Sequence, residues 1–287
     1  MMNTSTKLPP PDETQEYHTT LLVIYSVVLL CGTVSLSLMM YIMKSSTGST
    51  TSIAINNLIF AHFIFLFTVP FRIYYYSANR WTLGFGLCKI VSAMIHIHMH
   101  MSFILYVIIL VTRLLTFYHN TTQVASFRRI HALIGSALVW IIVLVIVPCV
   151  IYFLYGKQSD STDKCFRFGK STQSTVSRVF NYIMSPLIIV VALVLTALQV
   201  NVLWILRRTH RQGQQEFGAQ LKSLFFALIM VACFIPYHIF RLYYLKNVKE
   251  LQSINEVFLS LTTFNCLDML TFLGRRTCNI CLSGRAN

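Results

Sequence analysis

Apolar residues along this chain fall into seven long runs separated by short polar stretches. The runs cover roughly residues 19–43, 53–76, 88–117, 129–154, 176–206, 217–245 and 252–274. Each run can cross about 30 Å of hydrocarbon, which takes about 20 helical residues. Because backbone groups within lipid must be hydrogen-bonded inside their own segment, each run is predicted to be a helix rather than a barrel strand. The pattern predicts an all-α membrane protein, a seven-transmembrane helix bundle.

The composition agrees with a chain that lies mostly in lipid. Of the 287 residues, 55% are hydrophobic and 11% are charged, whereas soluble domains carry about 25% charged residues. The loops leave no room for a catalytic domain, and no acid–base or nucleophile constellation lies where water could reach it. We therefore expect that the protein is not an enzyme, needs no cofactor and has no nucleic-acid partner. The expected organisation is an extracellular segment (1–18), the bundle (19–274) and a cytoplasmic tail (275–287).

The ends of the first run indicate its orientation. An odd number of spans puts the two termini on opposite sides of the lipid bilayer. Lys and Arg divide almost evenly between the two sides, but the acids Asp12, Glu13 and Glu16 precede the first run and Lys44 follows it. This favours an outside N-terminus, as does the glycosylation acceptor sequence that begins at Asn3. The run lacks the features of a cleaved signal peptide, so we expect a multi-pass plasma-membrane protein.

Landmarks in the third, sixth and seventh runs follow the order and spacing of rhodopsin-like G-protein-coupled receptors. Thr112-Arg113-Leu114 resembles the family's Asp-Arg-Tyr, with only the arginine retained. The stretch from Cys233 through Pro236 resembles the Cys-Trp-x-Pro motif, with Phe234 for tryptophan. Asp268 opens a segment that stands where the family has Asn-Pro-x-x-Tyr. The sixth-helix variant is similar to the branch that holds purinergic nucleotide receptors, and the resemblance covers nearly the whole chain.

The resemblance implies a set of structural and signalling roles. Cys88 and Cys165 match the family's disulfide, against the alternative of two unpaired surface thiols. Arg113 is expected to contact a heterotrimeric G protein when active and Glu216 when inactive; the alternative is an arginine that snorkels at a helix end. Arrestin is a further expected partner. Pro236 supplies a kink that lets the sixth helix swing, and Phe234 is the expected packing switch or, alternatively, an ordinary core aromatic.

Two ionisable residues fall deep inside the predicted bundle. In the family, an aspartate of the second helix, an asparagine of the seventh and a serine of the third can hold a sodium ion. In this chain His62 stands at the position of the aspartate, Asp268 at that of the asparagine and Ser102 at that of the serine. Since intramembrane ionisable groups are costly and usually paired, we expect His62 and Asp268 to bond directly without sodium; the alternative is two separately hydrated groups. His96 and His100 share a helix face and His98 is expected to point elsewhere, so too few ligands converge to predict a metal.

The predicted outer side is net basic, which suggests the ligand. Guanidinium groups suit phosphate or carboxylate, and no acid in the outer third helix could anchor an amine. The hypothesis is a small anion such as a nucleotide, fatty acid or lysophospholipid; the alternative is a basic rim that faces lipid headgroups or glycans. The predicted lining residues are Arg72, Tyr75, His96, His100, Arg167, Tyr237, His238, Arg241 and Tyr244.

The predicted function is transmission of an extracellular signal to G proteins by a two-state helix rearrangement. Cys278 and Cys281 follow two arginines just inside the membrane and are expected to be palmitoylated, or else are inert thiols. Two other functions stay open. One is a constitutively active or scaffold receptor without a diffusible ligand, and the other is a membrane transporter or channel, for which no internal repeat is seen.

Overall fold

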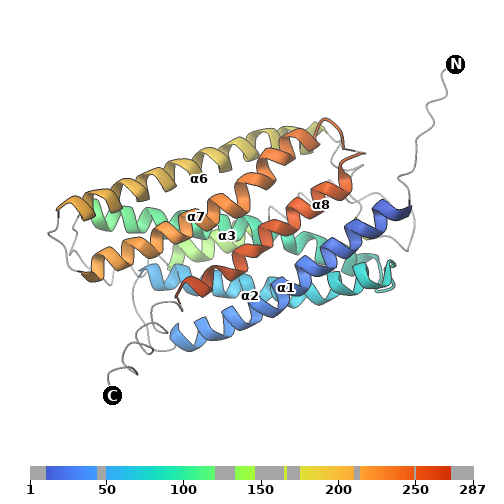
Figure 1. Cartoon of the computed structure of the whole chain (residues 1–287), viewed down its shortest axis with the longest axis horizontal. Helices are drawn as coiled ribbons and strands as arrows, with labels where there is room; N and C mark the ends of the chain where they lie inside the picture. The colour runs from blue at the N-terminus through green and yellow to red at the C-terminus, as the bar shows by residue number, and fades with distance from the viewer. Residues whose placement is uncertain are drawn as a thin grey trace.

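The chain forms a bundle of long helices that lie side by side (Figure 1). The structure is a computed structural model that describes residues 11–43, 50–119, 133–145, 165–166, 175–209, 214–248 and 250–272. Side chains at several helix ends, Glu216 among them, lie outside the description. The other predicted sites outside it are Asn3, Arg167, Cys278 and Cys281.

The helices follow the predicted apolar runs. They are α1 (Pro11–Met43), α2 (Thr50–Ala78), α3 (Phe85–His119), the shorter helix Leu133–Val145, α6 (Thr175–Thr209), α7 (Gln214–Tyr244) and α8 (Gln252–Leu261), which continues into the 3₁₀ helix η1 (Thr262–Phe272). Five of the described helices are long and apolar enough to cross a membrane. Helix α1 packs on α2 and η1. Helix α3 packs on α2, α6 and α7, and helix α7 packs on α6, α8 and η1. The predicted seven-helix bundle is confirmed.

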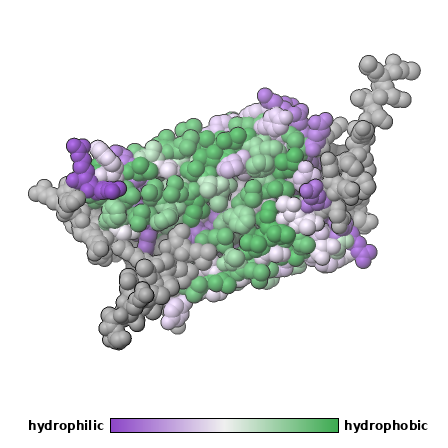
Figure 2. All heavy atoms as spheres, in the orientation of Figure 1, coloured by the Kyte–Doolittle hydropathy of each residue, from purple (hydrophilic) through white to green (hydrophobic). Residues whose placement is uncertain are grey.

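The outside of the bundle is apolar where lipid would contact it. Figure 2 shows a hydrophobic band across the middle, with hydrophilic residues towards the two ends. On α6, Ile183 and Val190 are 62% and 57% exposed, and Trp204 is 57% exposed. A continuous exposed apolar surface of this kind marks a membrane contact rather than a water-facing one.

The first helix begins earlier than its apolar run. The run starts near residue 19, whereas α1 begins at Pro11. Proline is favoured at the first helical position because its missing N–H would have no partner there in any case. The polar residues 11–18 therefore extend the helix by about two turns beyond the predicted apolar run.

The seventh run is not one α-helix. The α-helical part ends at Leu261 and the rest is 3₁₀. The hydroxyls of Thr262 and Thr263 each donate over 2.6 Å to the carbonyl three residues earlier, at Leu259 and Ser260. These side-chain bonds compete with the α-helical pattern, and 3₁₀ segments of this length are uncommon and often mark a hinge. The second half of the seventh span, with Asp268, is thus wound differently from the first half.

A glycine brings three elements close together. A Cβ atom on Gly32 of α1 would lie 3.0 Å from a methyl carbon of Leu66 on α2 and 3.6 Å from Cβ of Cys266 on η1. Small residues permit this approach of helix backbones in membranes. The contact holds η1 against α1 and α2 at the depth of His62 and Asp268.

Candidate functional site

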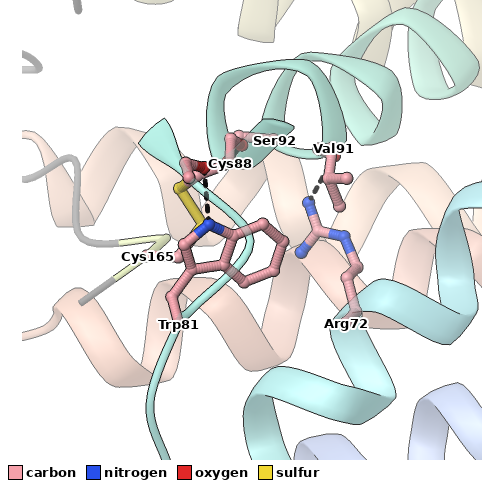
Figure 3. The surroundings of a disulfide bond; sticks show 7 residues. Arg72, Trp81, Cys88, Val91, Ser92 and Cys165 are labelled. Carbon is pink, nitrogen blue, oxygen red and sulfur yellow. Dashed lines mark hydrogen bonds between the residues drawn. A yellow bond between two sulfur atoms is a disulfide. The ribbon is translucent and has the colours of Figure 1, made fainter. Parts of the chain in front are cut away.

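A disulfide ties the start of α3 to Cys165, which lies in the chain between the helix Leu133–Val145 and α6. Cys88 and Cys165 are bonded, 77 positions apart in the chain (Figure 3), so the predicted pairing is confirmed. The loop before α3 is held by the indole N–H of Trp81, which donates over 2.7 Å to the carbonyl of Gly84. Gly84 has φ +82°, in the left-handed region that favours glycine. Because Cys165 is bonded to α3, the disulfide also fixes the position of the next residue, Phe166.

Phe166 covers the guanidinium of Arg72. Arg72 is 1% exposed, and its carbon Cζ lies 4.4 Å from the ring centre of Phe166 and 5.4 Å from that of Tyr25. The guanidinium donates to the hydroxyl of Tyr25 and to the carbonyl of Val91, each over 3.1 Å; Figure 3 shows the bond to Val91 beside the disulfide. Arg72, on α2, is thus held by groups on α1 and α3 and by Phe166.

Aromatic rings surround Phe166 on its other sides. The ring of Tyr75 meets it edge-on at 5.1 Å between centres, and Trp81 does so at 5.8 Å. Tyr76 stacks on it at 6.0 Å and on Tyr25 at 5.9 Å. The predicted lining residue Tyr75 therefore belongs to an aromatic cluster that closes the outer end of α2.

Arg241 joins three helices. Its Nε donates over 3.0 Å to Oδ1 of Asn181 on α6, and a terminal nitrogen donates over 3.0 Å to Oδ1 of Asn255 on α8. Its Cζ also lies 4.9 Å from the ring centre of Tyr244. The side chain is 6% exposed. Two amide oxygens orient this guanidinium, which lies in the last turn of α7.

The predicted histidines have neighbours in the same region as the two arginines. His96 is close enough to Arg72 and Arg241 to interact electrostatically with both. A ring nitrogen of His100 forms a hydrogen bond of 2.8 Å with the backbone carbonyl of His96. His238 bonds the hydroxyl of Ser185 on α6 over 3.2 Å. The ring of His238 also meets the ring of its neighbour Tyr237 in an edge-to-face arrangement. The predicted lining residues thus lie in the half of the bundle that carries the disulfide, except Arg167, which lies outside the described residues.

Glu256 changes the electrostatics of this region. In the fold its carboxyl interacts electrostatically with both Arg72 and Arg241. One carboxylate therefore faces two guanidiniums. The arrangement keeps a net positive charge, but a smaller one than the two arginines alone would give.

A polar cluster lies deeper, between α2, α3 and η1. The Nε2 of His62 lies 3.3 Å from the carboxylate of Asp268, and both side chains are buried, at 1% and 0% exposed. The hydroxyl of Tyr106 donates over 2.5 Å to the same carboxylate. The direct His62–Asp268 contact that the sequence predicted is present.

Two members of this cluster were not predicted. His98 points away from the face that His96 and His100 share, as predicted, but its partner was not foreseen: its Nε2 lies 2.9 Å from Nδ1 of His62. Cys266 lies 3.6 Å from His62 and 3.5 Å from His98, measured from its Sγ to a ring nitrogen of each. A signal was available, because His98 and the inward-facing Ser102 are four residues apart and share a helix face. The cluster of His62, His98, Cys266 and Asp268 is called the deep cluster below.

The predicted switch residue packs beside the deep cluster. Phe234 is fully buried, and its ring lies 6.2 Å from that of Tyr106 and 5.8 Å from that of Phe103. Pro236 lies inside α7, two residues further on. Arg113 is half-buried near the inner end of α3, whereas the side chain of Glu216 is outside the description, so their ion pair stays a prediction.

An apolar groove of about 490 Å³ lies elsewhere, between α1 and α2. Its lining includes Phe67 and Met40, which are 71% and 48% exposed towards the lipid side. The groove has no part in either polar region.

The comparisons with known proteins agree with this architecture. Residues 34–270 match the family described as 7 transmembrane receptor (rhodopsin family). The chain belongs to this family. It is similar to human probable G-protein coupled receptor 141, with 38% identity over 265 residues that cover 88% of this chain and 87% of the relative. It is 26% identical to chimpanzee probable G-protein coupled receptor 34, over 86% of this chain and 70% of the relative.

A third relative is mouse 2-oxoglutarate receptor 1, 26% identical over 76% of this chain and 66% of the relative. Family membership makes this chain a G-protein-coupled receptor of the plasma membrane, with a multi-pass helical body. It therefore couples to a G protein and belongs to a class of receptors rather than enzymes.

Proposed function

We propose that this receptor binds a small extracellular anion beneath its outer loops and transmits the signal through Phe234 and Tyr106 to the inner end of the bundle. The proposal includes an outside N-terminus, with Asn3 glycosylated, and an inside tail in which Cys278 and Cys281 are palmitoylated. Arrestin is proposed as a second partner on the inner side. The observation that carries the proposal is the convergence of Arg72, Arg241 and His96 within one outer region.

The charges of this region favour an anionic ligand. Two neutral amide oxygens, of Asn181 and Asn255, accept hydrogen bonds from Arg241 and orient its guanidinium. Glu256 is the carboxylate that interacts with both it and Arg72. A ligand carboxylate or phosphate would complete the neutralisation and could form paired hydrogen bonds with a guanidinium.

A chain of contacts links this region to the deep cluster. Tyr237 and His238 lie on α7 one turn above Phe234. Phe234 packs on Tyr106, whose hydroxyl donates to Asp268, which in turn meets His62. A ligand that shifts α7 would change the packing of Phe234 and so bias two arrangements of the bundle. An outward swing of the inner end of α7, hinged at Pro236, would free Arg113 for a G protein.

The name of one relative supports the class of ligand. The mouse protein is named a 2-oxoglutarate receptor, and 2-oxoglutarate is a small dicarboxylate. At 26% identity, this suggests acidic ligands as a class to test and does not select a compound.

The test measures G-protein activation by wild type and variants in whole cells. Without ligand, Arg113→Ala should lower basal activation in whichever of the four G-protein classes couples. A panel of dicarboxylates, nucleotides and lysophospholipids is then applied to wild type, Arg241→Ala and Arg178→Ala; Arg178 is exposed on α6 and serves as the matched control. The potency of an active anion should fall at least about tenfold on Arg241→Ala, which corresponds to roughly 1.4 kcal/mol of binding free energy, and should not fall on Arg178→Ala. Equal potency on all three receptors would remove Arg241 from the site.

A second function is favoured by one observation. Arg72 already has two hydrogen-bond partners and two aromatic neighbours within the protein, as if Phe166 occupied part of the place of a ligand. A receptor that signals without a diffusible ligand would show basal activation that falls with Arg113→Ala but no response to the anion panel.

A further inference from the structure

The deep cluster contains three side chains that bind transition metals. Nδ1 of His62, Nε2 of His98 and Sγ of Cys266 lie within 4.8 Å of one another. They come from three elements, α2, α3 and η1, and all three residues are buried. Imidazole and thiolate are ligands of zinc, whereas hard cations such as sodium prefer oxygen ligands.

We propose that His62, His98 and Cys266 bind one zinc ion, and that Asp268 holds His62 in position from behind. The inference concerns an ion site in its own right, and only its effect on signalling rests on the proposed function.

The distances fit one face of a tetrahedral site. Zinc lies about 2.0–2.1 Å from nitrogen and about 2.3 Å from sulfur, which sets ideal separations of roughly 3.3 Å between two nitrogens and roughly 3.6 Å between nitrogen and sulfur. The two nitrogen–sulfur distances are 3.6 Å and 3.5 Å, and the nitrogen–nitrogen distance is 2.9 Å. A ring shift of a few tenths of an ångström at one histidine would complete the fit.

The surroundings of His62 match those of a metal-bound histidine. Such histidines commonly give their second ring N–H to a carboxylate, which fixes the ring and the tautomer. Here Nε2 of His62 lies 3.3 Å from Asp268, on the opposite side of the ring from the cluster nitrogen. Tyr106 in turn donates to that carboxylate. His98 is held by Phe65, which stacks on it with ring centres 4.2 Å apart.

The charges balance in the bound state. Zinc binding releases one proton from the Cys266 thiol, because the ligand is the thiolate. The thiolate and the Asp268 carboxylate together offset the two positive charges of the ion, so the buried cluster becomes neutral. A neutral cluster avoids the high cost of an isolated charge at that depth.

A fourth ligand is available nearby. Ser102 lies one turn from His98 on α3 and is fully buried, and its hydroxyl makes no hydrogen bond within the described part of the chain. This hydroxyl, or a water beside it, would fill the open position that three-ligand zinc sites keep.

The test uses the purified full-length receptor, stripped of metal by a chelator and titrated with zinc chloride. Bound zinc is counted by mass spectrometry of the metal, and the thermal unfolding of the same samples is followed. Wild type should bind one zinc ion. Cys266→Ser and His98→Asn should each lower the affinity for zinc by at least about 100-fold. Asp268→Asn should lower the affinity by about 10–100-fold, as is typical when the hydrogen-bond partner of a metal ligand is changed. Cys233→Ser and His100→Asn, which alter a cysteine and a histidine outside the deep cluster, should leave affinity within about threefold.

Cobalt gives a reading on wild type alone, in case a variant does not fold. Cobalt(II) bound here should show a thiolate-to-cobalt charge-transfer band and the strong visible bands of a tetrahedral ion. The proposal fails if wild type binds no zinc, if Cys266→Ser binds it equally well, or if cobalt shows no thiolate band. In those cases the cluster is a hydrogen-bonded chain from His98 to Asp268. Because no G protein is present, this outcome is independent of whether the proposed signalling role holds.

Discussion

The hydroxyl of Tyr106 on α3 donates a 2.5 Å hydrogen bond to Oδ2 of Asp268 on η1. The same hydroxyl also lies 3.3 Å from the carbonyl of Asn265. Tyr106 is therefore the residue through which the aromatic packing around Phe234 meets the buried carboxylate. It links the proposed switch on α7 to the irregular half of the seventh span.

Tyr106→Phe should destabilise the resting arrangement. The change keeps the ring and removes the donor, which leaves a buried carboxylate oxygen with one partner fewer, at a cost of about 1–3 kcal/mol. We expect a lower unfolding temperature of the purified receptor and a change in basal G-protein activation. Tyr118→Phe is the control, since Tyr118 is 54% exposed near the inner end of α3. A Tyr106→Phe receptor as stable as the control would contradict the role given to this bond.

Phe166→Ala should uncover Arg72. The variant loses the cation–π contact, which contributes about 0.5–2 kcal/mol, and leaves a cavity among Tyr75, Tyr76 and Trp81. We expect a loss of about 3 kcal/mol in stability, typical of buried phenylalanine truncation, measured by thermal unfolding. Phe63→Ala, at a position 53% exposed towards lipid, should cost much less. If the two variants unfold alike, Phe166 is not a packed cover.

Arg241→Lys should behave almost like Arg241→Ala. Two different nitrogens of the guanidinium donate to Asn181 and Asn255, and a lysine ammonium cannot reproduce this fixed fork. Hydrogen bonds to charged groups contribute about 1.5–3 kcal/mol, so both variants should lower stability and ligand potency. Arg178→Lys, at an exposed position of α6, is the control. Full recovery of potency by lysine would show that charge alone is required.

Gly32→Val should separate α1 from its neighbours. Already a Cβ would lie 3.0 Å from Leu66, and the two further methyl groups of valine would meet Leu66 and Cys266. Overpacking of this kind costs about 1–3 kcal/mol, which thermal unfolding would detect. Gly135→Val is the matched control, because no described atom lies within 4 Å of a Cβ there. Equal effects of the two substitutions would mean that α1 can move away without cost.

Much of the fold could be predicted because the bilayer imposes simple rules. Apolar runs long enough to span it must be helices, and the landmarks from Cys88 to Asp268 fix their order. These rules do not distinguish an α-helix from a 3₁₀ helix, which local chemistry decides. At the start of the 3₁₀ segment, the hydroxyls of Thr262 and Thr263 donate to the carbonyls three residues earlier, which an apolar count does not detect.

The candidate sites show the same division. Arg72, Arg241 and His62 could be chosen from the sequence because charged residues within apolar runs are rare. Their partners could not, because Tyr25, Asn181, Asn255 and Phe166 are ordinary residues until packing brings them into contact. His98 was correctly expected to point away from His96 and His100, but its place in the deep cluster was missed, although its spacing from Ser102 indicated it.

By itself, the sequence determined that this chain crosses a membrane as a helical bundle, which residues carry charge into it, and which family it resembles. Only the tertiary structure decided that His62, His98 and Cys266 converge on one point and that Phe166 closes over Arg72. The physical reason is that hydrophobicity is read along the chain, one segment at a time. The geometry of a site depends on the rotation and depth of several helices relative to one another, and packing between distant segments sets both.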